Sequence, residues 1–197
     1  MIMSQERDIR QLKEDIYFKA DLRGHSMKFL TTWGLFSPKQ IDNGSYMLID
    51  LVPVRPTDKV LDLGCGYGPI GLALAKEAKK GSVHMVDKDF VAIKYAKNNA
   101  RLNKLHNTDI YLSNGLSAVK EKSFDLVVSN IPAKVGKEML YIMLKEAKYS
   151  MKKGAQIYVV TITGLRQYIK REFTEIFGNY KKVKQGKQYT VAMATKE

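Results

Sequence analysis

The stretch VLDLGCGYGPIG, from Val60 to Gly71, decides the fold. A short apolar run ends in a cluster of glycines, and a helix-forming run with a proline near its start follows. Glycines at such a point let the chain turn sharply and bring its backbone close to a ligand, because they carry no side chain. The stretch therefore predicts a buried strand, a ligand-binding loop and a helix, in that order.

The same alternation continues toward the C-terminus. Strand-like apolar runs are expected at residues 82–87, 109–114, 124–130 and 155–161, and amphipathic helical runs at 69–80, 89–103, 137–151 and around 165–176. Strands that alternate with helices predict an α/β fold with a doubly wound, mostly parallel sheet. Residues 180–196 depart from this pattern as two strand-like runs around Gly186, which predicts an antiparallel hairpin at one edge.

The residues before the alternation form a lead-in. Ile9, Leu12 and Ile16 have helical spacing within residues 4–19, which predicts a surface helix, and residues 27–37 are rich in β-branched and aromatic side chains, which predicts a short hairpin. Asp42 or Asn43 is a suitable cap for a third element, a helix within residues 41–52. We expect one domain over residues 1–197, with a lead-in at 1–53 and a core at 54–197.

Composition limits the classes of partner. The chain has 197 residues and a formal net charge of +13, which favours contact with polyanions and hence with nucleic acid; the alternative is a lysine-rich solvated surface. A single cysteine and no apolar run of about 18 residues indicate a reducing environment and no membrane span. The charged N-terminus lacks a signal-peptide pattern, and the three histidines lack metal-ligand spacing, so we expect a cytoplasmic protein without a metal.

The glycines of the opening stretch can be counted in two ways. Gly64-x-Gly66-x-Gly68 is typical of a loop that holds S-adenosylmethionine, whereas Gly66-x-Gly68-x-x-Gly71 is the dinucleotide fingerprint. Asp87 follows Gly66 by 21 residues, which suits a ribose-binding acid in both cases.

Asp62 favours the first count. A carboxylate beside the helix start repels a pyrophosphate but attracts the ammonium and sulfonium groups of S-adenosylmethionine. The alternative role for Asp62 is to cap local backbone amides.

Several segments together carry a family resemblance. The stretch 60–71, Asp87, SNG at 113–115 and SNIPAKVGKE at 129–138 resemble class I S-adenosylmethionine-dependent methyltransferases. The resemblance is greatest to the small-ribosomal-subunit guanine-N2 methyltransferases and their short archaeal stand-alone relatives, and the lead-in at 34–52 shares it. It implies a seven-stranded Rossmann-like sheet, S-adenosylmethionine as cofactor, and a base of rRNA or tRNA as substrate.

The resemblance also implies which residues bind the cofactor. The loop residues Gly64, Cys65, Gly66 and Gly68 would follow the methionine and ribose parts, with Asp62 beside them, and Asp87 would bind the ribose hydroxyls next to Lys88. Asn114 and Gly115 stand where the family has Asp-Gly at the adenine; the alternative for Asn114 is a turn residue. Cys65 is expected to fill the loop rather than to act as a nucleophile.

For catalysis the resemblance points to Asn130, which it also places among the cofactor-binding residues, and to Pro132. In amino-methyltransferases the motif is Asn-Pro-Pro-aromatic, and the Asn oxygen and the next carbonyl orient an exocyclic amine, so positioning supplies most of the rate. Here Ile131 replaces the first proline and Ala133 the aromatic, which removes a base-stacking platform worth about 1–3 kcal/mol. Phe36, Trp33 and Tyr67 are the candidate replacements.

Basic side chains are the expected contacts to a phosphate backbone. The candidates are Lys134, Lys137 and the run KKVKQGK at 181–187; the alternative for this run is a solvated edge that discourages sheet association. We therefore expect a methyltransferase of rRNA or tRNA that acts on a base, with the guanine exocyclic amine favoured and Phe36, Ile131, Lys134 and Lys137 near the substrate. The alternatives are methylation of a protein amide nitrogen or a small molecule, a non-catalytic cofactor-binding subunit, and a nicotinamide oxidoreductase.

Overall fold

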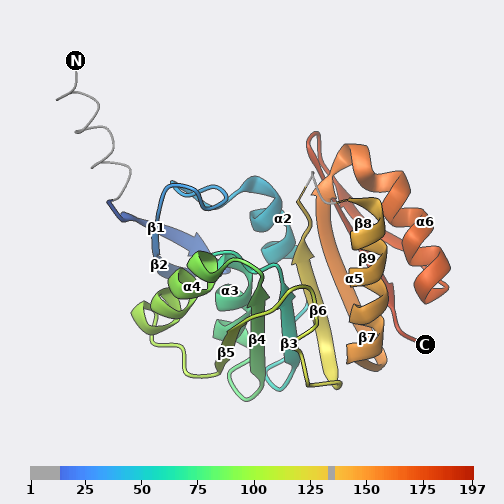
Figure 1. Cartoon of the computed structure of the whole chain (residues 1–197), viewed down its shortest axis with the longest axis horizontal. Helices are drawn as coiled ribbons and strands as arrows, with labels where there is room; N and C mark the ends of the chain where they lie inside the picture. The colour runs from blue at the N-terminus through green and yellow to red at the C-terminus, as the bar shows by residue number, and fades with distance from the viewer. Residues whose placement is uncertain (1–13, 133–135) are drawn as a thin grey trace.

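Seven strands form one sheet in the order β5-β4-β3-β6-β7-β9-β8 (Figure 1). The computed structural model describes residues 14–132 and 136–197. The strands β3 to β7 pair in parallel, β9 is antiparallel to β7, and β8 is antiparallel to β9, which confirms the doubly wound sheet and its C-terminal hairpin. Their bounds are β3 Lys59–Leu63, β4 Ser82–Asp87, β5 Thr108–Leu112, β6 Phe124–Asn130, β7 Met151–Ile162, β8 Lys181–Gln185 and β9 Tyr189–Thr195.

Helices cover both faces of this sheet. Successive residues of a strand point to opposite faces, so Val60 packs in one core cluster and Leu61 in the other. The first cluster lies under α2 (Asn43–Leu51), α3 (Pro69–Glu77) and α4 (Phe90–Leu102), and the second under α5 (Lys137–Ser150) and α6 (Arg166–Phe177), which follows a short 3-10 turn at Thr163–Leu165. No helix in the described part of the chain is long and apolar enough to cross a bilayer.

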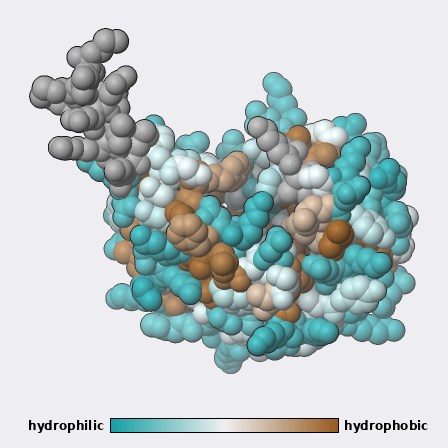
Figure 2. All heavy atoms as spheres, in the orientation of Figure 1, coloured by the Kyte–Doolittle hydropathy of each residue, from teal (hydrophilic) through white to brown (hydrophobic). Residues whose placement is uncertain are grey.

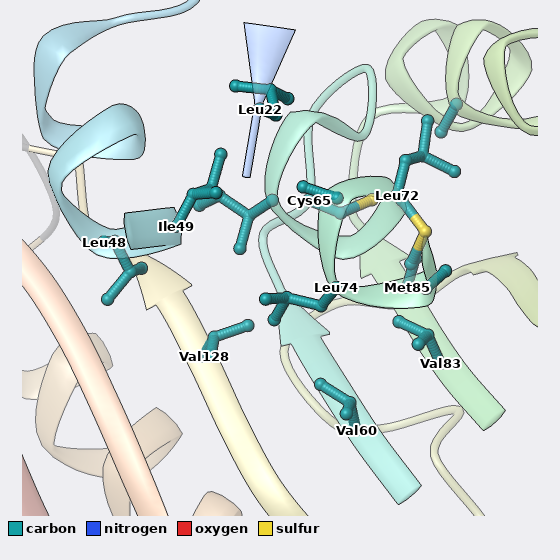
Figure 3. Packing of buried hydrophobic residues seen from close by; sticks show 14 of the residues in the cluster. Leu22, Leu48, Ile49, Val60, Cys65, Leu72, Leu74, Val83, Met85 and Val128 are labelled. Carbon is teal, nitrogen blue, oxygen red and sulfur yellow. The ribbon is translucent and has the colours of Figure 1, made fainter. Parts of the chain in front are cut away.

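Close packing of α3 on β4 fixes the position of the glycine loop. Figure 3 shows the side chain of Met85 directed at Leu72, and both are fully buried. A Cβ atom at Gly71 would lie 2.7 Å from Cγ of Met85, and one at Gly68 would lie 2.8 Å from its Cε. Gly71 therefore allows the helix to approach the strand closely, whereas a side chain at Gly68 would have to displace the tip of Met85.

The N-terminal hairpin differs from the expectation in its position. It consists of β1 (Ile16–Leu22) and β2 (His25–Thr31), paired in antiparallel register. Residues 16–19 are thus strand and not the end of a helix, while the rest of the expected helix lies mainly outside the described residues. The hairpin expected at 27–37 has only its first half in a strand, because residues 32–37 form turns.

The turn explains where this hairpin lies. Arg23 and Gly24 have φ values of 52° and 78°, as in the two-residue turns that match the twist of a hairpin. Alternation buries Ala20 and Leu22 on one side of β1, so the side chains from residue 16 onward follow the period of a strand.

Two asparagines of the α4 region attach the hairpin to the core. The side chain of Asn99 accepts a hydrogen bond from the Leu30 amide at 2.7 Å and donates to the Leu30 carbonyl at 3.0 Å. Asn103 makes the same pair of contacts to Lys28, at 2.9 and 2.7 Å. The hairpin is therefore held beside α4, and the segment that follows it is led across the top of the molecule to α2 (Figure 1).

Candidate active site

The site lies where β3 and β6, neighbours in the sheet, end at the same edge. Ligands of open α/β sheets bind at such a point, where the strand order reverses. The hydroxyl of Ser129 on β6 donates to the carbonyl of Leu63 on β3 at 2.7 Å. Gly64 and Asn130, the next residue of each strand, are thereby brought to one place, as the sequence predicts.

The loop glycines fall into two kinds. Gly64, Gly66 and Gly68 all have positive φ, at 75°, 57° and 99°, where a side chain is disfavoured. A Cβ atom at Gly64 or Gly66 would meet nothing within 4 Å, whereas Gly68 is packed against the core. The first two glycines thus leave an open cradle beside the backbone, which fits the passage of a bound cofactor.

Asp87 supports this cradle from the end of β4. Its Oδ2 accepts a hydrogen bond from the Gly66 amide at 2.9 Å, and its Oδ1 accepts from the Asp89 amide at 3.0 Å. Lys88 is exposed beside it. The carboxylate is thus held at the rim of the loop, in the position expected for a ribose-binding acid.

Asp62 lies beneath the loop and has no exposed surface. Its Oδ2 accepts from the Gly71 amide at 2.7 Å, so the residue does cap a local backbone amide. Its Oδ1 is buried and has no hydrogen-bond partner in the described part of the chain. Burial raises the pKa of Asp62 to about 7, against the Gly71 hydrogen bond that lowers it, and the charge of Asp87 adds to the rise. A buried carboxylate oxygen without a partner fits a cationic group of a ligand.

Cys65 belongs to the core rather than to the chemistry. Its side chain is 4% exposed and packs in the cluster under α3 (Figure 3). Burial, followed by the charges of Asp62 and Asp87, raises the pKa of this thiol well above its usual value. The thiol is therefore protonated at neutral pH, which argues against a nucleophilic role.

The segment after β5 forms the next wall. Asn114 is exposed, and Gly115 has a φ of 58°. Ser113 fixes the turn, because its hydroxyl donates to the Gly115 carbonyl at 2.8 Å and accepts from the Ala118 amide at 3.1 Å.

Two apolar residues near this wall were not predicted. Leu112, which pairs with Asp87 in the sheet, is 53% exposed, and Phe90, at the start of α4, is 73% exposed. Figure 2 shows hydrophobic residues gathered beside a hollow on this face. Exposed apolar side chains at the end of β5 and the start of α4 are candidate contacts for a flat ring. The sequence signal would have been an apolar residue just before a polar strand end.

Asn130 is held by its amide nitrogen. The Nδ2 donates to Oδ2 of Asp42 at 2.7 Å and to the hydroxyl of Ser45 at 2.9 Å. No described residue donates to its Oδ1, and the side chain is only half-buried. The Ile131 amide donates to the Val160 carbonyl at 3.0 Å with its side chain in the core, and Pro132 follows exposed.

Asp42 is the residue that sequence reasoning assigned only to a helix cap. It does cap α2, because its Oδ1 accepts from the Gly44 amide at 3.0 Å and its Oδ2 from the Ser45 amide at 2.9 Å. Burial acts to raise the pKa of Asp42, but hydrogen bonds from Tyr189, Ser45 and Gly44 together outweigh it and lower the pKa below its usual value. The carboxylate is therefore ionised at neutral pH.

The three aromatic residues considered for base stacking differ in exposure. Phe36 is 69% exposed and Trp33 is 40% exposed, with the ammonium of Lys39 at 4.7 Å from the Trp33 ring centre. Tyr67 is buried, and its hydroxyl donates to the carbonyls of Ser37 and Gln40, so it holds the Phe36 loop and offers no stacking face.

The basic candidates also differ in place. Lys137 is exposed at the start of α5, and Lys134 lies outside the described residues. Lys184 and Lys187 are exposed at the β8–β9 turn, which reaches the carboxyl edge of the sheet because the Thr163 amide after β7 donates to the Gln188 carbonyl at 2.8 Å. Residues 14–132 and 136–197 contain no group of three His, Cys, Asp or Glu side chains arranged to hold a metal ion.

Known proteins resemble the chain over most of its length. The methyltransferase small domain family matches residues 26–193. The uncharacterized protein YbxB of Bacillus subtilis (strain 168) is 31% identical over 159 residues, which are 80% of this chain and 78% of that protein. The ribosomal RNA small subunit methyltransferase C of Haemophilus influenzae (strain PittGG) is 33% identical over 131 residues, which are 64% of this chain and 39% of that protein.

A solved structure shows the same architecture. The T. thermophilus 16S rRNA N2 G1207 methyltransferase in complex with AdoMet and guanosine matches with a TM-score of 0.83 and 27% identity, over 93% of this chain and 51% of that chain. The chain thus spans most of YbxB but about half or less of these two rRNA methyltransferases.

Proposed function

Because the chain belongs to the methyltransferase small domain family, we propose that it methylates a base of ribosomal RNA, with the exocyclic amine of guanine as the favoured target. The family uses S-adenosylmethionine, which supplies the methyl group. An rRNA substrate would place the reaction in the cytoplasm. The relatives named for rRNA methylation support the substrate class, and the contacts of Asn130 support the target atom.

The cofactor half of the site is assigned to eight residues in three groups: the glycine cradle, two acidic side chains and the surface around the end of β5 and the start of α4. Gly64 and Gly66 leave the open cradle for the methionine and ribose parts, and Asp87 at its rim accepts hydrogen bonds from ribose hydroxyls. Asp62 offers its unpartnered Oδ1 to the cationic end of the cofactor. Leu112 and Phe90 supply apolar surface for the adenine, with Asn114 and Gly115 at its edge.

The single observation that carries the target assignment is the orientation of Asn130. Its nitrogen is used twice within the protein, so its oxygen is the atom left for a substrate. An amide oxygen accepts hydrogen bonds only, and an exocyclic amine is a donor. The Ile131 carbonyl adds a second acceptor, and Pro132 restricts the backbone at this point. Two acceptors hold both amine hydrogens and aim the nitrogen lone pair at the methyl group, which accelerates the reaction by positioning.

The charged surface supports an RNA substrate. The chain carries a formal net charge of +13, and Lys184 and Lys187 are exposed at the edge of the sheet that holds the site. Lysines that neutralise phosphates supply much of the affinity for RNA. The base must leave its stack to reach Asn130, so it needs a new aromatic surface to stack on. The motif lacks an aromatic residue at Ala133, and the exposed ring of Phe36 replaces it.

The test is methyl transfer from radiolabelled S-adenosylmethionine to separate acceptors. These are small-subunit rRNA, large-subunit rRNA, tRNA and ribosomal protein. We expect label in rRNA, and a decrease of about 100-fold or more in turnover for Asn130→Ala with unchanged cofactor affinity, because only positioning is lost.

Asn107→Ala is the matched control, since that amide donates to the Ala75 and Ala78 carbonyls at the opposite edge of the sheet. It should lower stability but leave turnover of the folded protein intact. Label in tRNA would show that the RNA substrate is tRNA and not rRNA. Label only in protein would contradict the proposal.

A further inference from the structure

We propose that Asp42 and Ser45, at the start of α2, are positioning residues that fix the side-chain amide of Asn130 with its oxygen toward the substrate. This inference rests on the proposed function, because it concerns the same amine-binding residue. It joins the start of α2, whose residues have so far served only as a helix cap, to the reacting centre.

The chemistry of Asp42 determines which way the Asn130 amide points. Nitrogen and oxygen of an asparagine side chain are assigned from their partners. An ionised carboxylate accepts hydrogen bonds and donates none, so the atom 2.7 Å from Oδ2 of Asp42 must be the nitrogen. The hydroxyl of Ser45 accepts the second hydrogen at 2.9 Å. The reverse orientation would place the Asn130 oxygen against a carboxylate oxygen and is excluded.

The carboxylate itself is rigidly held. Oδ1 accepts from the Gly44 amide, and Oδ2 from the Ser45 amide, so the first turn of α2 fixes both oxygens. The ring of Tyr189 packs over Gly44, where an added Cβ atom would lie 2.8 Å from its Cδ1. A hydrogen bond to Asp42, followed by burial, raises the pKa of Tyr189 to about 12. Rotation of the Asp42 side chain would break several contacts at once.

The arrangement suits the charge that develops during methyl transfer. The lone pair of the amine forms the new N–C bond as the C–S bond breaks and its electron pair returns to sulfur, and the amine then releases a proton to solvent. The amine nitrogen becomes positive in this step. An amide that donates to a carboxylate is polarised toward greater negative charge on its oxygen. The Asn130 oxygen thus stabilises the transition state more strongly than an amide without Asp42 would.

Two substitutions at position 42 separate this role from helix capping. Serine and asparagine cap helices about as well as aspartate. Asp42→Asn keeps a carbonyl acceptor for Asn130 but loses the charge, whereas Asp42→Ser caps the helix with a hydroxyl too short to reach Asn130. We expect kcat to fall by about tenfold for Asp42→Asn and about 100-fold for Asp42→Ser, with cofactor affinity unchanged. Ser45→Ala should lower kcat by about tenfold, because one hydrogen bond to the Asn130 amide is lost.

Asp58→Asn is the matched control. Asp58 is also a buried aspartate that accepts from a backbone amide, that of Arg55 at 2.8 Å, but it precedes β3 at the opposite edge. Its kcat should equal that of the unmodified protein. If Asp42→Ser and Asp42→Asn both retain full activity, or both lose the same activity together with thermal stability, Asp42 is only a helix cap and the inference is wrong.

Side-chain amide NMR tests the same contact without any substrate. The Asn130 Nδ2 signals, identified by their loss in Asn130→Asp, should be shifted and slow to exchange in the unmodified protein and fast in Asp42→Ser. Fast exchange already in the unmodified protein would overturn the inference. A failure of the proposed function is distinct, since it appears as no transfer to RNA by the unmodified protein while the amide signals keep their pattern.

Discussion

The two halves of the site are built from contacts of different range. On the cofactor side, Asp87 holds the amide of Gly66, 21 residues earlier, within one strand–helix–strand unit. On the substrate side, Asn130 is held by Asp42 and Ser45, which lie 88 and 85 residues earlier in the chain. The cofactor side is thus a local structure that one continuous stretch specifies, whereas the substrate side exists only once the lead-in has folded onto the sheet.

This difference predicts that the two halves fail separately. Substitutions in the glycine loop should remove cofactor binding and leave the Asn130 contacts intact. Substitutions around Asp42 should leave cofactor binding intact and lower kcat. The separation is tested by changing the cofactor half and observing the Asn130 amide of the substrate half.

The largest effect is expected from Gly66→Ala. A methyl group there meets no protein atom within 4 Å but enters the open cradle, and the φ of 57° disfavours a side chain. We expect stability to fall by about 1 kcal/mol and the affinity for S-adenosylmethionine by about 100-fold, measured by calorimetric titration. The Asn130 amide signals should stay unchanged; if they move, the halves are coupled and the comparison does not hold.

Gly71→Ala should lower stability more than cofactor affinity, the reverse of Gly66→Ala. Its Cβ atom would lie 2.7 Å from Cγ of Met85 and 2.9 Å from Oδ2 of Asp62, so the cost falls on packing. Urea unfolding should show a loss of about 1–3 kcal/mol, with cofactor affinity of the folded protein close to normal. A loss of affinity larger than the loss of stability that persists in an Asp62→Asn background, where a shift of the carboxylate no longer matters, would show that Gly71 faces the ligand and would favour the dinucleotide count of the glycines.

A smaller effect is expected from the pH dependence that Asp62 introduces. Its pKa rises from 3.8 to about 7 on folding, so between these values the folded protein binds more protons than the unfolded one. The free energy of unfolding should therefore fall as the pH rises through this range, relative to Asp62→Asn.

A cation bound at Oδ1 favours the ionised carboxylate, so cofactor affinity should rise by up to about tenfold for each pH unit up to about pH 7. Asp62→Asn should remove this dependence. An equal pH dependence in both proteins would show that Asp62 does not titrate with cofactor binding.

Much of the cofactor side could be predicted because its signals are local. The apolar run, the glycines and Asp87 stand in a fixed order, and parallel strands bring their carboxyl ends together. The two tasks of the glycines could not be predicted, since the same residue type serves an open cradle at Gly66 and tight packing at Gly71. That distinction depends on how closely α3 lies against Met85.

The substrate side was predicted only in part. The motif predicts Asn130 as a substrate-binding candidate, but Asp42 gave only the signal of a helix cap, and nothing in the sequence pairs it with a residue so distant. The lead-in hairpin lies earlier than expected because the chain turns at Arg23-Gly24, two residues with positive φ, and not within residues 27–37. The exposed rings and lysines are candidate contact surfaces, and neither the sequence nor the fold of this chain alone specifies what they contact.

The most direct test of the central claim is to identify the methylated atom. Labelled rRNA from the transfer reaction would be digested to nucleosides and analysed by chromatography and mass spectrometry, with Asn130→Ala as the comparison. The orientation of the Asn130 oxygen predicts a single guanosine carrying its methyl group on the exocyclic nitrogen, absent with Asn130→Ala. A methyl group on a ring nitrogen, on carbon or on ribose, or one that persists with Asn130→Ala, would contradict the account.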